Sequence, residues 1–560
     1  MEAQQATPAG SGLGSRRHDG AGRTAGALET RKIALVEKAV ALAHETLDAP
    51  QRATAERVVA GFYEHVPPTD IAERRPRDLW GAAWSLWRFA ERRRPDQAKI
   101  RVYNPDPATD GWSSPHTIVE IVNDDMPFLV DSVSLAINAS GRIVHLVIHP
   151  VMTVTRDPTG RLCELCGAEA AGLRESWMQI EITRESDRDD LARLAQTLSG
   201  VLADVRAAVE DWQPMRKRLR DLLDELSSPP APPVPPAELN EVQNFLRWLD
   251  DDNFTFLGYR EYVFDGIAAP LRGPLGILRD EEHPVFGGLR DLSSLPPDVQ
   301  HFVRRRELLV ITKSNRRATV HRTVHMDAIG LRRFAPGGEA VGIHLFLGLF
   351  TSLAYSRNPR SIPLLRLKVR RIIERAGLPS ASHDGKALLH ILDTFPRDEL
   401  FQTDEDQLFD TVIGILNLQE RQRIALFIRR DPLERFASCL LYVPRERYDT
   451  ALRERFSAIL EEAFAGQLSN FYTHLDESPL ARIQFIIRTT CGRVPMVDVT
   501  ILEKRLADAG RSWSDRLEEA ATAAFGEEEA RARLRSFQPF PITYQARTEA
   551  TQAVADLRRI

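Results

Sequence analysis

Two adjacent acids and a proline stand at a short joint between a predicted strand and a predicted helix. They are Asp124, Asp125 and Pro127, within the stretch IVNDDMPFLVDSVSLAINASGRIVHLVIHPVMTV. Carboxylates where a helix begins can be catalysts, metal ligands or N-caps. An acid at the N-cap and a proline in the first turn favour a structural role. The alternative is an effector or partner surface, because backbone N–H groups are free at such a helix start.

Two pairs of histidines could bind a metal ion. His145 and His149 share one face of a predicted strand, and His321 and His325 repeat that spacing with Asp327 next on the same face. No third ligand can be identified for either pair, so a satisfied or exposed strand face is favoured over a metal site. A metal-dependent hydrolase that uses these histidines ranks third among the functions considered.

Cysteines offer little more. Cys163 and Cys166 form half of a zinc or redox motif at a predicted hairpin tip. Cys439 and Cys491 are single and far apart in the sequence, so a matching second pair is missing. We therefore expect no metal in this chain.

Two charged clusters also favour structural interpretations. The acidic stretch DTFPRDELFQTDEDQLF has the start signals of a turn followed by a capped helix. An arginine-rich stretch near a predicted helix is interpreted as a solvated or interdomain face, with anion binding as the alternative. Its arginines are Arg357, Arg360, Arg366, Arg370 and Arg371.

Motifs of complete enzymes are missing from the sequence. It contains no G-x-G-x-x-G after a predicted strand, no G-x-x-x-x-G-K-[ST], no G-x-S-x-G and no H-E-x-x-H. None of its eight lysines stands in a glycine-rich loop that would carry a catalytic amine. These residues predict a multi-domain regulatory or assembly module with neither catalytic nor cofactor-binding residues of its own.

Composition limits the partners. The chain has 560 residues, 43% hydrophobic and 27% charged, with a net charge of -5. This balance gives no reason to expect nucleic acid or an anionic membrane as a partner. No apolar run reaches the roughly 20 residues of a membrane span, and no secretory signal precedes the first helices. With only four cysteines, the expected location is the cytoplasm.

Hydrophobic periodicity predicts an α+β, multi-domain chain. A β-α-β-β-α order, the split β-α-β pattern of ferredoxin-like folds, occurs twice with little residue identity. The expected segments are a disordered tail (1–30), a helical lead-in (31–97), the first β-α-β-β-α unit (98–226), a proline-rich linker (227–237), a helix with antiparallel strands (238–340), a mainly helical segment (341–430), a further β-α-β-β-α unit (431–530) and the start of a helical connector (531–560).

Several separate motifs, in order, make the chain resemble the N-terminal half of the bacterial large NAD-specific glutamate dehydrogenases. They are NDDMPFLVDSV, VHLVIHPVMTV, ESWMQIEI, FLRWLDDDNFTFLGYREY, LLVITKSNRRATVHR and DTFPRDELFQTDEDQLF. The resemblance implies two or three ACT-like units on antiparallel sheets, with 238–340 as a candidate second one. It also implies oligomer building, with a tetramer expected for the full-length enzyme, and, as in some relatives, control by amino acids.

The family's activity is the oxidation of L-glutamate to 2-oxoglutarate and ammonium with NAD. The resemblance places the catalytic lysines, the catalytic Asp and the NAD-binding glycines in a C-terminal half that this sequence does not resemble. The chain is therefore expected to hold no cofactor, to be inactive alone, and to have its own catalytic half as a partner. The apparent helix at Ile560 ends without a cap, as though a longer protein continued there.

In ACT domains that bind amino acids, a small residue in the first loop lets the ligand approach the backbone. Here Asp125 and Pro127 match that loop, but Phe128 stands where glycine is common. This favours a packing role for Asp124, Asp125, Pro127 and Phe128. Should an effector bind, the candidate places are this helix start, the one near Tyr448, or an interface between paired units. The rival function is a stand-alone ACT-type amino-acid sensor or interaction protein.

Overall fold

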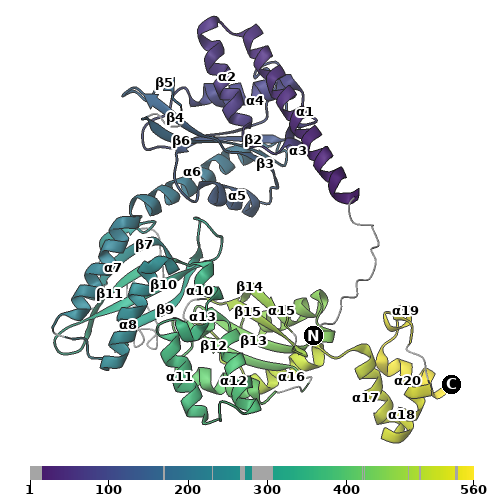
Figure 1. Cartoon of the computed structure of the whole chain (residues 1–560). Helices are drawn as coiled ribbons and strands as arrows, with labels where there is room; N and C mark the ends of the chain where they lie inside the picture. The colour runs from purple at the N-terminus through teal and green to yellow at the C-terminus, as the bar shows by residue number, and fades with distance from the viewer. Residues whose placement is uncertain are drawn as a thin grey trace, which may run out of the picture.

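The computed structural model describes residues 16–559 apart from 168–170, 230, 265–270, 281–306, 419–420, 422, 477, 491–492 and 537–539. Within that part, three antiparallel sheets follow one another along the chain, joined and covered by helices (Figure 1). The predicted α+β, multi-domain class is confirmed. Among the described helices, none is long and apolar enough to cross a membrane.

Four helices at the start of the chain pack on the first sheet. The rings of Trp80, Trp84 and Trp87 lie in series, and Trp87 contacts Trp177 of the sheet with 5.9 Å between ring centroids. The helices are α1 (Arg16–Thr46), α2 (Ala49–Tyr63), α3 (Pro68–Ile71) and α4 (Pro76–Ala90). The prediction that 1–30 is a disordered tail is wrong from Arg16 onward, where α1 begins. The alanines and arginines of this helix favour helical structure. Residues 1–15 lie outside the described part.

The first sheet has the order β1-β2-β6-β4-β5, and β3 also pairs with β6. Pro150 separates β3 from β4, since proline has no N–H for the ladder. Helices α5 and α6 cover the face opposite α1–α4 (Figure 1). The elements are β1 (Lys99–Tyr103), β2 (Thr117–Asp124), α5 (Leu129–Ala139), β3 (Val144–Ile148), β4 (Val151–Arg156), β5 (Leu162–Leu165), β6 (Leu173–Ile182) and α6 (Arg188–Glu210).

The second sheet has the order β8-β7-β11-β10-β9 and is antiparallel throughout. The proline-rich stretch before it separates two helices, and the described residues 228–229 and 231–235 form neither helix nor strand. The elements are α7 (Trp212–Ser227), α8 (Pro236–Trp248), the π-helical turn η1 (Leu249–Asn253), β7 (Phe254–Val263), β8 (Leu271–Gly276), β9 (Leu309–Arg317), β10 (His325–Phe334) and β11 (Ala340–Phe350).

Two strands correct the mainly helical segment predicted for 341–430. Strand β11 lies inside the second sheet between β7 and β10, and β12 (Ala425–Arg430) forms the edge of the third sheet. Residues Leu345 to Phe350 of β11 are all buried. An apolar run buried on both faces shows no period-2 alternation, so the pattern resembled a buried helix.

The residues between these strands are helical and connect the second and third sheets through a shared hydrophobic core. Asp404 caps α14 by accepting from the Gln407 N–H at 2.8 Å, as the start signals in the acidic stretch predicted. The elements are α10 (Ser352–Ser356), η3 (Pro359–Ser361), α11 (Leu365–Ala376), α12 (His383–Thr394), α13 (Arg397–Gln402) and α14 (Glu405–Leu416).

The third sheet, of order β12-β13-β15-β14, repeats the architecture of the first. In both, an antiparallel leading strand precedes the β-α-β-β-α order and pairs with its first strand. The predicted repeat is confirmed, and both units have more strands than the three expected: six in the first sheet, where β3 and β4 take the place of one long strand, and four in the third. The elements are β13 (Phe436–Pro444), η4 (Arg445–Arg447), α15 (Thr450–Ala463), β14 (Gln467–His474), β15 (Leu480–Arg488) and α16 (Val499–Ala509).

The last helices form a separate small core (Figure 1). Helix α17 packs against α18 and α20, so the unit predicted to reach residue 530 ends before α17. Its amphipathic pattern predicted a helix but could not specify which surface the apolar face covers. The elements are α17 (Trp513–Phe525), α18 (Glu527–Ser536), α19 (Ile542–Gln545) and α20 (Ala550–Arg559).

Lys368 joins α11 to the end of α13. Lys368 on α11 donates to the carbonyl oxygens of Leu400 and Thr403 at 2.8 and 2.7 Å, where α13 ends. We expect Lys368→Met to lower the free energy of unfolding by about 2–3 kcal/mol, because these carbonyl oxygens lose a charged donor. Denaturant titration measures the change. Arg370→Met, on the exposed side of the same helix, should change it by less than about 0.5 kcal/mol.

Candidate functional site

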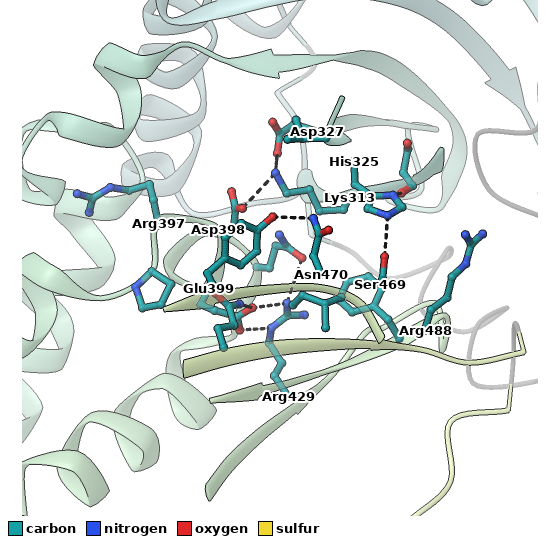
Figure 2. Close-up of a pocket in the computed structure, with 18 of the residues that line it drawn as sticks. Lys313, His325, Asp327, Arg397, Asp398, Glu399, Arg429, Ser469, Asn470 and Arg488 are labelled. Carbon is teal, nitrogen blue, oxygen red and sulfur yellow. Dashed lines mark hydrogen bonds and ion pairs between the residues drawn. The ribbon is translucent and has the colours of Figure 1, made fainter. Parts of the chain in front are cut away.

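A cavity of about 450 Å³ lies between the second sheet, α13 and the third sheet. Lys313 and Asp327 are direct cross-strand partners on β9 and β10, so both side chains leave the same face of the second sheet. Residues from the three elements converge there (Figure 2). The cavity is lined by Lys313, His325, Asp327, Asp398, Glu399, Arg429, Ser469, Asn470 and Arg488, among others.

One lysine holds two carboxylates together. Lys313 Nζ lies 2.6 Å from Asp327 Oδ1 and 3.1 Å from Asp398 Oδ2. Tyr355 donates to Asp398 Oδ1 at 2.9 Å, and the Phe350 N–H donates to Asp327 Oδ2 at 3.2 Å. Burial disfavours the charged amine, but the two carboxylates outweigh it and hold the pKa of Lys313 well above its usual value. The lysine is therefore a fixed cation at neutral pH and not a nucleophile.

A buried ion pair forms the wall of the cavity on the side of the third sheet. Arg429 Nε and Nη2 donate to the two oxygens of Glu399 at 2.6 and 2.8 Å, and both side chains are about 95% buried. Ser438 and Gln484 donate to Glu399 Oε1 at 2.8 and 2.9 Å. This network attaches α13 to the third sheet.

A histidine connects the two sheets across the rim. His325 Nε2 lies 2.9 Å from Ser469 Oγ on β14, and Nδ1 lies 3.2 Å from the Ser314 carbonyl oxygen. The carbonyl can only accept, so Nδ1 carries the proton and Nε2 accepts from Ser469. Burial, with Arg317, Arg488 and Lys313 nearby, lowers the pKa of His325 to about 4. His325 is therefore neutral at pH 7.

The acids at the first helix start do not cap α5. The N-cap is Phe128, whose side chain makes no capping bond, so the predicted N-cap role of Asp124 or Asp125 is wrong. Asp124 ends β2 and pairs with Arg93 and Arg206 at 2.5 and 2.6 Å, and Asp125 pairs with Arg174 at 3.0 Å. Both acids are therefore held by ion pairs with neighbouring elements and do not cap the helix.

Phe128 forms an interdomain contact, with Pro127 just before it in the loop. Phe128 has a φ of 71°, and its ring centroid lies 5.0 Å from that of His321, in the turn between β9 and β10. The His321 N–H donates to Ser132 Oγ at 3.0 Å, and Thr319 donates to Asp204 at 2.7 Å. The aromatic ring thus packs against the turn of the second sheet. It occupies the position at which a glycine would let a ligand approach the backbone.

Tyr448 belongs to the third sheet's unit and does not join the residues around Phe128. Its hydroxyl lies 2.9 Å from Thr473 Oγ1 on β14, and it precedes the Asp449 N-cap of α15. The histidines considered as metal ligands have other partners. His145 stacks on His116, while His149 contacts Ser176. Among the described residues, no group of three or more His, Cys, Asp or Glu side chains could hold a metal ion.

The cavity is the site that sequence reasoning missed. His325 and Asp327 were noted only as a metal-ligand pattern, and Asp398 and Glu399 only as part of a capped helix. Lys313 carried a weak signal, because lysine is rare in this arginine-rich chain. The residues come from several segments spread between Lys313 and Arg488, so no local spacing brings them together.

Buried histidines predict a fall in stability toward acid. Burial, with Arg218 and Arg333 nearby, lowers the pKa of His344 from 6.5 to about 3. Below pH 6.5 the unfolded chain binds a proton that the folded chain does not, so the free energy of unfolding decreases as pH falls. We expect about 1.4 kcal/mol per pH unit from His344 between pH 6 and 4. Urea titrations at several pH values should show a shallower fall in His344→Gln; an unchanged slope would contradict this.

The chain matches three family models in succession. They are described as the ACT1 domain of glutamate dehydrogenase over residues 58–198, its helical motif 1 over 362–421 and its ACT2 domain over 425–514. The first range contains most of the first sheet with its covering helices, and the last contains the third sheet. The cavity lies between the second sheet and parts of the two later ranges.

Curated relatives match along most of the chain. Each is named NAD-specific glutamate dehydrogenase: that of Halomonas elongata is 38% identical over 544 residues, that of Pseudomonas aeruginosa 36% over 511, and that of Mycobacterium tuberculosis 29% over 487. These alignments cover 95%, 89% and 84% of this chain but 34%, 31% and 29% of the relatives. The chain thus spans about a third of their length, and the resemblance predicted from the sequence is confirmed for that region.

Proposed function

We propose that this chain, which carries the ACT1 domain, helical motif 1 and ACT2 domain of glutamate dehydrogenase, is the N-terminal regulatory and oligomerisation region of an NAD-dependent glutamate dehydrogenase. The full-length enzyme would oxidise L-glutamate to 2-oxoglutarate and ammonium with NAD, in the cytoplasm. Its catalytic half would be the partner of this chain, and an amino acid its effector. The succession of the three matched regions is the observation that carries this proposal.

The chemistry of the described residues supports a regulatory role over a catalytic one. Lys313 is held as a cation between two carboxylates, and the Cys439 thiol is fully buried with its pKa raised by burial. A protonated amine and a buried thiol are poor nucleophiles. The same ion pairs instead join the second sheet to α13, a suitable arrangement for relaying a change in one unit to the next.

An unpaired sheet edge supports the proposed oligomer. Strand β14 ends the third sheet, and no described strand pairs with its outer side. Phe471 and Tyr472 on this strand, and Leu475 just after it, are 40%, 49% and 52% exposed. An exposed apolar edge strand is a site where a second copy can pair.

Light scattering of the purified chain during gel filtration tests assembly. We expect a mass that is a multiple of the 63.1 kDa chain, with a tetramer for the full-length enzyme. Phe471→Lys at the strand edge should reduce the mass, whereas Arg455→Lys on the exposed side of α15 should not. A monomer at every concentration tested would contradict the oligomerisation role and favour the stand-alone sensor.

A further inference from the structure

The carboxylate oxygens of the cavity already have donors. Asp327 and Asp398 share Lys313 and each accept one further hydrogen bond, while both oxygens of Glu399 accept from Arg429. A ligand that brought mainly donor groups, such as a simple amine, would find these acceptors occupied. The groups that still lack a hydrogen-bond partner must therefore be donors.

Two guanidinium groups at the cavity each have one buried nitrogen without an acceptor. Arg429 Nη1 and Arg322 Nε are buried, and neither finds a hydrogen-bond partner in the described structure. Leaving a buried charged donor unpaired costs free energy. Arg397 also has unpaired nitrogens, but it donates to the Arg357 carbonyl and points away from the other labelled side chains (Figure 2). We therefore leave Arg397 out of the site.

Charge at the cavity is unbalanced. With Arg397 left out, the described lining residues include six lysine or arginine and three aspartate or glutamate, and Arg435 pairs with Asp431 outside the lining. Arg322, Arg482 and Arg488 make no ion pair with a described residue. Arg488 is exposed, lines the cavity, and is close enough to His325 to lower its pKa. An anion would satisfy the open N–H groups and the excess positive charge together.

From this arrangement we infer that the cavity binds a small organic dicarboxylate. One carboxylate would accept from the free Arg429 N–H group inside, and the other from Arg488 at the rim. The volume of about 450 Å³ accommodates such a molecule. Because the cavity joins the second sheet to the third, the ligand would stabilise their contact, and its regulatory meaning rests on the proposed function.

Calorimetric titration of the purified chain tests this site. Succinate is the probe, with succinamide as its neutral analogue and acetate as a monocarboxylate, all at equal ionic strength. We expect saturable binding of succinate, at least tenfold weaker binding of acetate and none of succinamide. Aspartate is added as an amino-acid arm: binding of aspartate without succinate would overturn the inference in favour of an amino-acid site.

Variants locate the binding. Arg429→Lys keeps a cation beside Glu399 but removes the free N–H group, and should weaken succinate binding about tenfold. Arg488→Gln at the exposed rim should weaken it about fivefold without disturbing the fold, whereas Arg455→Gln on α15 should have no effect. No succinate binding, or equal binding by Arg488→Gln and Arg455→Gln, would overturn the site. Neither result would alter the test of assembly, so failure of the two proposals can be distinguished.

Discussion

Glu399→Ala should lower the free energy of unfolding by about 3–5 kcal/mol, because it leaves the Arg429 guanidinium buried without its counter-charge. Ser438 and Gln484 lose their acceptor in the same change. Helix α13 would lose its attachment to the third sheet. Urea titration followed by circular dichroism measures the loss.

Two further variants separate charge burial from a general loss of packing. Glu405→Ala removes an exposed partner of Arg371 and should cost less than about 1 kcal/mol. The double change Glu399→Leu with Arg429→Leu removes both buried charges and should recover much of the loss. If Glu399→Ala is no worse than Glu405→Ala, the ion pair does not hold α13 as described.

Glu175→Ala is expected to be at least as damaging to the first unit, at about 4–5 kcal/mol. The fully buried Glu175 carboxylate accepts from Arg93 at 2.8 Å, Arg156 at 2.7 Å and Trp177 at 2.9 Å. Burial raises the pKa of Glu175, but the hydrogen bonds from Arg156 and Trp177 outweigh it and hold the pKa below its usual value. Removing this side chain leaves the buried Arg156 side chain without its counter-charge and takes one of two carboxylate partners from Arg93.

Tryptophan fluorescence reports on that change, because Trp177 lies beside both Glu175 and the tryptophans of α4. The variant should unfold its first unit at much lower denaturant concentration than the natural chain. Glu164→Ala, at an exposed position of the same sheet, should unfold as the natural chain does. Coincident unfolding curves for Glu175→Ala and Glu164→Ala would contradict the role given to Glu175.

The sequence predicted those parts of the fold whose pattern of residues is local. The β-α-β-β-α order was readable because alternation and helical periodicity change within a few residues. Strand β11 was not, since its apolar run suits a buried helix equally well. The N-cap prediction at Asp124 failed because distant arginines, Arg93 and Arg206, hold that acid in place.

The cavity lay beyond sequence reasoning for a related reason. Asp327 gained its meaning only when the register of β9 and β10 placed Lys313 opposite it. Arg429 pointed to a ligand only because the folded structure leaves its buried Nη1 without a hydrogen-bond acceptor. Pairing across strands and unmet hydrogen bonds are properties of the folded chain, and no spacing along one sequence encodes them directly.

We propose that this region supports an enzyme without carrying out its chemistry. The most direct test is to incubate the purified chain with L-glutamate and NAD and to follow NADH by absorbance, with an active glutamate dehydrogenase as the positive control. Hydride transfer requires a site that positions NAD against the substrate, so we predict no glutamate-dependent NADH. NADH formation that scales with the concentration of this chain would contradict the claim.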